Sequence, residues 1–253
     1  MNSMQESKVK SLEKALKLLD FFTPQRPELG ITELSNLSGL LKSSVHNMVS
    51  TFEVCGYLEK NIVTGKYRLG KRILILSNSL YSSNDVRLIV RPYMEKLSAQ
   101  FGETVYFAQY MDGVVVYLDA VFTAQNMSSR QIIGMTAPMY CTGVGKAILA
   151  FLSKEQIQQV IDSGLIGFTE QTITTKDKLL KEFEVIRKNG YAIDNMEHEF
   201  GIKCVAAPIF NSTGKIVAAL SLSGPSLRFS QERITELAGA IVAYSKEISK
   251  LIL

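Results

Sequence analysis

The feature that most constrains the fold is a pair of short amphipathic segments that meet at Gly39. The first begins near Thr32, whose hydroxyl we expect to cap a helix. The second follows Gly39 at once, and glycine readily adopts the left-handed conformation that ends a helix. Two short helices joined by such a tight turn are typical of a helix-turn-helix. Their apolar residues, spaced as on helix faces, are Leu34 and Leu37 in the first segment and Val45, Met48, Val49 and Phe52 in the second.

A helix is predicted before this pair and a β-hairpin after it. Apolar residues recur at helical spacing from Leu12 to Phe22, and Pro24 ends the pattern. Segments 56–60 and 66–70 are predicted strands on either side of a glycine bend. Elements in this order make a winged helix-turn-helix over residues 1–71. The face of the first helix that we expect to be buried consists of Leu12, Ala15, Leu16, Leu19 and Phe22.

The second helix of the pair has a polar face with the properties that DNA recognition requires. Its small hydroxyl and amide side chains, with no acidic residue before Glu53, let a helix approach the major groove. There Asn47 can pair with adenine, and the hairpin cations can add a salt-dependent contact with the DNA backbone or the minor groove. A solvated face is the plainer alternative, but the three-helix context favours DNA. The predicted DNA-binding residues are Thr32, Lys42, Ser43, Ser44, His46, Asn47 and Ser50, with Lys60, Lys66 and Arg68 on the hairpin.

The excess positive charge is confined to the first quarter of the chain. Residues 1–72 hold 11 Lys and Arg against 7 Asp and Glu, whereas residues 73–253 hold 17 of each. A basic module joined to a neutral one fits a DNA-binding head on a sensing body. Chance scatter is the alternative, since the excess of +4 is small.

The composition argues against a membrane or secreted protein. No stretch approaches the roughly 20 apolar residues that span a bilayer, and the segment MNSMQESKVK lacks the apolar region of a signal peptide. Cys55, Cys141 and Cys204 lie far apart, which indicates free thiols in a reducing compartment rather than disulfides or a metal site. We therefore expect a cytoplasmic protein without a cofactor or a metal.

The rest of the chain predicts a linker helix within residues 72–84 and an α+β domain over residues 85–253. Asp112 and Gly113 separate two predicted strands and give a strong hairpin signal. Runs of strands with helices grouped around them imply a mostly antiparallel sheet flanked by helices. The predicted strands are 103–110, 114–121, 129–133, 191–193, 203–210 and 215–223, and the predicted helices are 85–101, 143–152, 154–162, 175–188 and 234–251.

Sequence blocks along nearly the whole chain resemble the IclR family of transcriptional regulators. In the head these blocks are GLLKSSVH at 39–46 and GYL at 56–58. In the body they are GMTAP at 134–138, TGVGKA at 142–147, GYA at 190–192, Glu197 and Glu199 through CVAAP at 204–208, and AALSLSGP at 218–225. The order and the spacing of these blocks are specific to the family.

The resemblance implies a GAF-like effector domain and a homodimer or homotetramer that binds a palindromic DNA operator. It also implies a small-molecule effector, usually a small organic acid, a sugar-acid intermediate or an aromatic acid. By position in the matching blocks, the family's effector-binding residues correspond to Gly143, Val144, Asp194, Cys204, Ser221 and Ser223.

The chemistry of these residues agrees with a small anionic effector. Segment 143–146 opens a predicted helix, so its N–H groups can hold a carboxylate. Ser221 and Ser223 alternate along one strand and therefore face the same side. Cys204 can face that side from the neighbouring strand. The plainer alternatives are solvated serines and a cysteine packed in the core.

Two places depart from the family pattern. His46-Asn47 stands where the family often has His-Arg, which removes a cation from the DNA face and predicts a shifted operator preference. Pro138-Met139-Tyr140 stands where the family often has Pro-Leu-His. Tyr140 would offer the effector a larger surface with a hydroxyl, so we expect an effector that differs from the family's commonest ones.

Other chemistries fit the sequence less well. Segment 143–147 is similar to a phosphate loop, but Tyr140 and Ala147 occupy the positions that need Gly and Ser or Thr. Cys204 and His198 lack the context of a nucleophile and its base, so we expect no catalysis. Metal ligands could in principle come from Asp194, Glu197, His198, Glu199 and Cys204, which leaves a metal effector as an outside option.

The sequence therefore predicts a DNA-binding regulator whose DNA affinity depends on a bound metabolite, with repression favoured over activation. The linker helix would transmit the effect of the ligand to the heads. The alternative is a metabolite-binding module or an enzyme that keeps a vestigial DNA-binding head.

Overall fold

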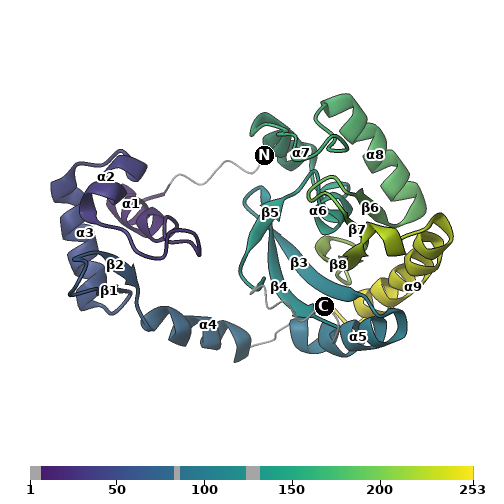
Figure 1. Cartoon of the computed structure of the whole chain (residues 1–253), viewed down its shortest axis with the longest axis horizontal. Coiled ribbons are helices and arrows are strands. Elements are labelled where there is room, and N and C mark those ends of the chain that lie inside the picture. The colour runs from purple at the N-terminus through teal and green to yellow at the C-terminus, as the bar shows by residue number, and fades with distance from the viewer. Residues whose placement is uncertain (1–6, 83–85, 124–131, 253) are drawn as a thin grey trace. The chain divides into compact units, whose positions relative to one another are not determined.

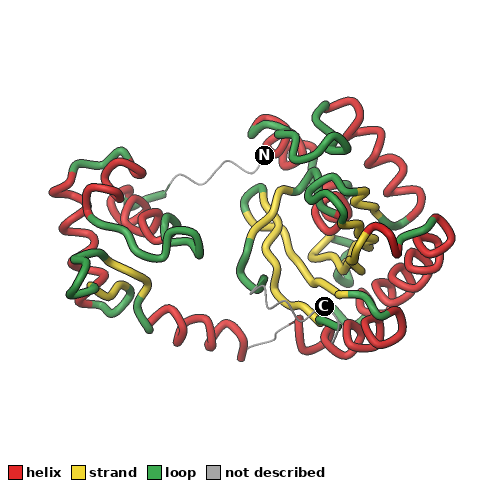
Figure 2. The backbone as a smooth tube through the Cα atoms, viewed as in Figure 1, coloured by secondary structure: helices red, strands yellow, loops and turns green. Residues whose placement is uncertain are grey.

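The computed structural model describes residues 7–82, 86–123 and 132–252. The chain divides into two compact units, Met1–Asp85 and Val86–Leu253. We call them the N-terminal unit and the C-terminal unit, and each is described by itself. Helices dominate the N-terminal unit, whereas strands form the centre of the C-terminal unit (Figure 2). No helix in the described ranges is long and apolar enough to cross a membrane.

The N-terminal unit is a winged helix-turn-helix followed by a fourth helix (Figure 1), which confirms the predicted class. The turn between the second and third helices contains Gly39, whose φ of 70° is the left-handed conformation expected there. The elements are α1 (Lys10–Leu19), α2 (Ile31–Ser38), α3 (Lys42–Val54), β1 (Leu58–Lys60), β2 (Tyr67–Leu69) and α4 (Arg72–Ser82). The core consists of Leu18, Phe22, Leu29, Leu34, Val45, Val49, Leu58 and Tyr67.

The start of α2 differs from the prediction, because Thr32 does not cap the helix. Gly30 is the N-cap residue, and its N–H donates a hydrogen bond of 2.7 Å to the carboxylate of Glu33. Thr32 lies instead in the first turn, where it is exposed. The Glu33 side chain reaches back to the cap position as in a capping box, so the helix can begin without a hydroxyl there.

The buried face of α1 also differs from the prediction. Leu18 and Phe22 enter the core, but Leu12 and Leu16 are 55% and 51% exposed. Helical periodicity identifies an apolar face of a helix, but it does not identify the surface that covers that face. Within the described N-terminal unit, this part of α1 is uncovered.

An antiparallel sheet of six strands forms the centre of the described C-terminal unit, in the order β5-β4-β3-β8-β7-β6. Asp112 and Gly113, with φ of 47° and 90°, connect two of these strands in a tight hairpin. The predicted α+β class with a mostly antiparallel sheet is therefore confirmed. The strands are β3 (Thr104–Met111), β4 (Val114–Val121), β5 (Thr136–Pro138), β6 (Ala192–Asn195), β7 (Ile202–Phe210) and β8 (Ile216–Pro225).

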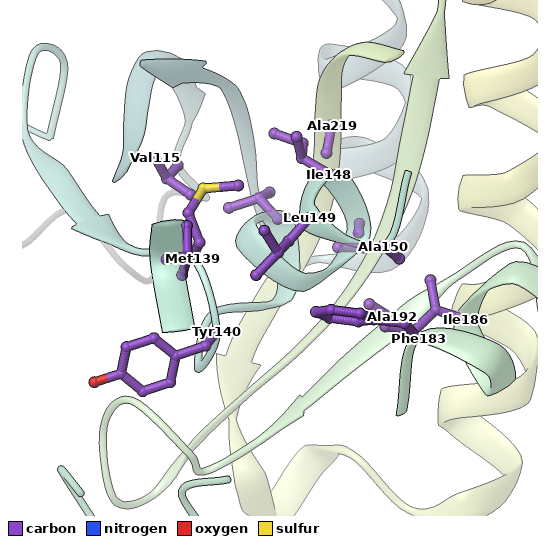
Figure 3. Close-up of a cluster of buried hydrophobic side chains, with 14 of the residues drawn as sticks. Val115, Met139, Tyr140, Ile148, Leu149, Ala150, Phe183, Ile186, Ala192 and Ala219 are labelled. Atoms are coloured by element: carbon purple, nitrogen blue, oxygen red, sulfur yellow. The ribbon is translucent and has the colours of Figure 1, made fainter. Parts of the chain in front are cut away.

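Helices cover both faces of this sheet (Figure 1). On one face lie α5 (Val86–Phe101) and α9 (Gln231–Ser249), and on the other lie α6 (Gly143–Leu149), α7 (Lys154–Asp162) and α8 (Lys176–Asn189). Because side chains alternate along a strand, Phe107 of β3 faces α5 and α9, while Ala108 faces α6. Figure 3 shows the core on the α6 side, with Leu149 and Phe183 among its members.

The edge of the sheet beside β4 was not predicted correctly. Residues 129–131 of the predicted strand 129–133 lie outside the described residues, and Ile132 and Ile133 are not in a strand. The strand that pairs with β4 is β5. It has only three residues, which is too short for an alternating pattern to mark it in the sequence.

Candidate functional site

The polar face of α3 is open to solvent. Val45 and Val49 are completely buried on the opposite face, and Met48 and Phe52 pack partly against the same core. Of the α3 side chains predicted to contact DNA, four are exposed and two are half-buried. The exposed ones are Lys42, Ser43, His46 and Asn47, and the half-buried ones are Ser44 and Ser50. This helix therefore has the burial pattern that a recognition helix needs, with one edge in the core and the other free for a groove.

The amino end of α3 is suited to a phosphate group. The N-cap residue is Leu41, whose side chain makes no capping hydrogen bond, and the first turn contains no acidic residue. The N–H groups of this turn and the helix dipole therefore favour a negative charge here.

The hairpin cations are partly paired with carboxylates, which the sequence did not indicate. Lys66 Nζ lies 3.0 Å from Glu33 Oε1, and an Arg68 guanidinium nitrogen lies 3.3 Å from Glu59 Oε2. Lys60 Nζ lies instead 5.6 Å from the centre of a tyrosine ring, a contact that leaves its charge uncompensated. Among the predicted hairpin cations, Lys60 is the one without an ion pair in the described part of the chain.

A cavity of about 480 Å³ lies against the α6 side of the C-terminal sheet. Strand register brings its polar residues together, because Asp194 pairs with Cys204 across β6 and β7, and Cys204 pairs with Ser223 across β7 and β8. The residues predicted to bind the effector all line this one cavity: Gly143, Val144, Asp194, Cys204, Ser221 and Ser223.

The polar residues of β7 and β8 face the cavity because side chains alternate along a strand. Ser221 and Ser223 line the cavity, whereas Leu222 between them packs in the core on the other face. The Cys204 thiol donates a hydrogen bond of 3.0 Å to Ser223 Oγ. Burial raises the pKa of this thiol far above its usual range, so it stays protonated and is unsuited to act as a nucleophile.

The amino end of α6 borders the cavity. Thr142 caps it, since its hydroxyl accepts the Gly145 N–H at 3.2 Å and donates to the Pro138 carbonyl at 2.8 Å. The N–H groups of Gly143 and Val144 have no acceptor among the described residues, so they can bind an oxygen atom of a ligand. A Cβ atom on Gly143 would lie 3.1 Å from the Cβ of Cys204, so the absence of a side chain allows this close approach to the sheet.

Asp194 is the most buried acid of the cavity lining, with 4% of its surface exposed. Burial raises the pKa of its carboxyl group to about 7, against the effect of a 2.7 Å hydrogen bond from the Glu197 N–H. The group is thus partly protonated near neutral pH.

A buried ion cluster beside the cavity was missed by the sequence reasoning. Lys146 of α6 is 1% exposed, and its ammonium group donates to the carboxylates of Glu197 and Glu182, the latter at 3.2 Å. Because Glu197 also donates its N–H to Asp194, the cluster holds the segment after β6 in place. The partners of Lys146 lie 36 and 51 residues away in the chain, so no local pattern announces them.

Tyr140, which was expected to contact the effector, is not among the residues that line this cavity. Tyr140 packs in the core on the α6 side, 5% exposed, and its hydroxyl donates to the Ile166 carbonyl at 2.8 Å. Figure 3 shows that hydroxyl directed away from the neighbouring aliphatic side chains. The polar lining residues that were not predicted to bind the effector are Thr104, Tyr106, Tyr117, Thr136, Thr142, His198 and Glu199.

Four of the residues considered as metal ligands line the cavity, but they are not arranged as a metal site. In the part of the chain that the structure describes, no group of three His, Cys, Asp or Glu side chains could hold a metal ion. The ring of His198 lies 5.2 Å from that of Phe168, and burial lowers the pKa of the imidazole.

A winged helix-turn-helix followed by an α+β domain with a polar cavity defines a class of DNA-binding transcriptional regulators. The chain belongs to the IclR family of these regulators. The family model for the IclR helix-turn-helix domain matches residues 11–61, and the model for the bacterial transcriptional regulator IclR C-terminal domain matches residues 78–250.

Individual relatives cover nearly the whole chain. The acetate operon repressor of Salmonella typhimurium is 33% identical over 244 residues, which are 95% of this chain and 89% of that protein. An IclR regulator from Alicyclobacillus acidocaldarius shares the fold with a TM-score of 0.84 at 22% identity, over 96% of this chain and 98% of that one. An IclR homolog from Microbacterium hydrocarbonoxydans, complexed with 4-hydroxybenzoate, shares it with a TM-score of 0.77 at 23% identity, over 94% and 98% of the two chains.

Proposed function

We propose that this regulator is a repressor that binds a palindromic operator and changes its affinity for that operator when a small organic acid binds in the C-terminal cavity. The meeting of the predicted effector-binding residues at one cavity of about 480 Å³ carries the proposal. This volume lies in the range of small-molecule sites. The repressor named among the relatives and the hydroxybenzoate bound by a homolog support repression and an acid effector.

The DNA-binding surface would be the exposed face of α3, with its amino end against a phosphate. Asn47 would pair with a base in the major groove, and Lys42 would contact the backbone. Thr32, exposed in the first turn of α2, would donate its hydroxyl to a phosphate. The remaining contacts would come from Ser43, Ser44, His46 and Ser50 of α3 and from Lys60, Lys66 and Arg68 of the hairpin.

A second copy of the chain would cover the apolar stripe that α1 leaves open. Val9, Leu12 and Leu16 follow one another at helical spacing and are between 51% and 55% exposed. Leu74 and Ile75 of α4 are 71% and 59% exposed. Large apolar side chains that are exposed in groups mark an interaction site. A two-fold dimer, alone or paired into a tetramer, would offer two α3 helices to the two halves of a palindrome.

The acid can change the operator affinity only if it binds one arrangement of the dimer's two N-terminal units more tightly than another. The change in operator affinity can be no larger than that difference in acid affinity. α4 (Arg72–Ser82), which precedes the C-terminal unit in the chain, would carry the effect to the heads.

The DNA part is tested with an operator selected from random duplexes by the full-length protein. Replacing Asn47 by Ala should weaken binding to the selected site by about 1–3 kcal/mol. Asn189→Ala, an exposed asparagine at the end of α8, is the matched control and should change nothing. Unchanged binding by Asn47→Ala would remove this residue from the interface, and no DNA binding at low ionic strength would overturn the whole proposal in favour of a vestigial head.

The ligand part is tested by thermal shift with a set of small carboxylic and sugar acids. An acid that binds in the cavity should stabilise the wild type but not the double variant Ser221→Ala, Ser223→Ala. Ser212→Ala, on an exposed turn, is the control and should keep the stabilisation. A shift that persists in the double variant would place the acid elsewhere.

A further inference from the structure

The wall of the cavity next to the amino end of α6 is acidic. Asp194 and Glu199 both line the cavity. A Cβ atom on Gly143 would lie 3.8 Å from the Cβ of Asp194, so the Asp194 carboxyl group borders the end of α6 that presents free N–H groups. An acid whose carboxylate accepts hydrogen bonds from Gly143 and Val144 therefore comes to lie against a second carboxyl group.

The described lining of the cavity contains no Lys or Arg. It therefore offers no cation that could neutralise two carboxylates. Lys146 of α6 is already bound by the carboxylates of Glu197 and Glu182. Burial lowers the pKa of His198, which disfavours the charged form of its ring. The other titratable groups near Asp194 are the Tyr117 phenol, the Cys141 and Cys204 thiols and the Glu199 carboxylate, and none of these can carry positive charge.

We propose that the cavity binds an organic acid together with one proton from solution. Asp194 holds this proton and donates it in a hydrogen bond to the carboxylate of the acid. Two carboxyl groups in contact do not both ionise, so one of them keeps a proton. The acid then accepts hydrogen bonds from Asp194 and from the α6 N–H groups and needs no cation. This inference rests on the proposed function, because it assumes that the effector is an acid.

The protonation state of Asp194 before the acid binds determines how the affinity for the acid changes with pH. Burial already raises the pKa of this group to about 7, and a neighbouring anion would raise it further. The acid thus binds the protonated form. Its affinity is constant below about pH 7 and falls about tenfold for each pH unit above that value.

The test measures binding of pyruvate and of 4-hydroxybenzoate to the full-length protein by titration calorimetry. Between about pH 6 and about pH 8.5, the dissociation constant of an acid that binds should rise about 30-fold. At the higher pH, titrations in buffers of different ionisation enthalpy should show the uptake of about one proton per acid bound.

Asp194→Asn removes the group that titrates but keeps the shape and the hydrogen-bonding positions of the side chain. The amide can accept the Glu197 N–H and donate to the acid without titrating. This variant should bind with the same affinity at both pH values, without proton uptake, and more tightly than the wild type at the higher pH. Asp177→Asn, which removes an exposed carboxylate from the first turn of α8, is the matched control and should keep the 30-fold change.

The outcomes distinguish this inference from the proposed function. A wild-type affinity that does not depend on pH, or a pH dependence that survives in Asp194→Asn, overturns the proton-linked site but leaves an acid-responsive repressor standing. If neither acid binds at about pH 6, the inference and the effector part of the proposed function fail together, while DNA binding is judged by its own assay.

Discussion

The face of α3 and the C-terminal cavity both gather polar side chains, but they do so by different means. The face of α3 belongs to one helix, and its residues are open to solvent while Val45 and Val49 hold the helix to its core. The cavity takes its residues from α6 and from each of the strands β3 to β8, and its wall is the central sheet itself. The α3 face therefore depends on the local period of a helix, and the cavity depends on the register of several strands.

This difference determines what a substitution can do. An exposed residue of α3 can change with little effect on folding, since it contacts solvent until DNA arrives. A cavity residue such as Asp194 or Ser221 is buried in the folded chain, so a change alters ligand binding and stability together. The three predictions below use this contrast.

The largest effect is expected from a charge placed under the α3 face. In Val45→Asp, an unpartnered carboxylate would enter the core of the N-terminal unit, at a cost of several kcal/mol, enough to unfold a unit of this size. DNA binding should be lost, while thermal unfolding of the C-terminal unit and its acid binding should persist, because that unit has its own cores.

The matched control for that variant is Val54→Asp, at a valine of the same helix that is 89% exposed. It should leave the fold of the N-terminal unit unchanged. Loss of acid binding in Val45→Asp would contradict the separation of the two units and would mean that they fold as one.

The same contrast explains how much could be predicted from the sequence. The turn at Gly39 and the buried valines of α3 follow from spacing within a single segment, and the structure has both as predicted. The cavity residues came from the resemblance to a family rather than from spacing, because Asp194, Cys204 and Ser223 become neighbours only through strand pairing.

The features that were missed depend on partners that are distant in the chain. Lys146 lies within an apolar block, and only the folded chain shows that Glu182 and Glu197 surround it. Tyr140 was assigned to the effector because of its hydroxyl, but the Ile166 carbonyl satisfies that group. For Leu12, the spacing correctly indicates an apolar helix face, but that face is exposed in the described part of the N-terminal unit.

An effect of intermediate size is expected from the pH dependence of stability. Because the folded-state pKa of Asp194 is raised to about 7 by burial, folding favours its protonated form. The stability of the wild type without ligand should therefore fall as the pH rises through this value, by about 1 kcal/mol between about pH 6 and about pH 8. Asp194→Asn should lack this change.

Urea unfolding of the two proteins at both pH values measures this prediction, and the difference between them isolates the group from other titrations. Equal pH dependence in wild type and variant would mean that Asp194 is more solvated than its burial indicates.

The smallest effect is expected in the salt dependence of DNA binding, and it depends on a difference between two lysines of the N-terminal unit. Lys60 carries its charge without an ion pair in the described residues, whereas Lys66 is already paired with Glu33. A phosphate contact from Lys60 releases a counterion, so Lys60→Met should reduce the slope of log affinity against log salt by about one.

The control removes the ion pair of Lys66 and Glu33 as a unit, in Lys66→Met with Glu33→Gln. It should change the slope much less, because the pair has no net charge to exchange for counterions. Gln can still accept the Gly30 N–H and so preserve the start of α2. Fluorescence anisotropy with the selected operator over a range of salt concentrations measures both slopes, and equal slopes for the two variants would show that the ion pair opens when DNA binds.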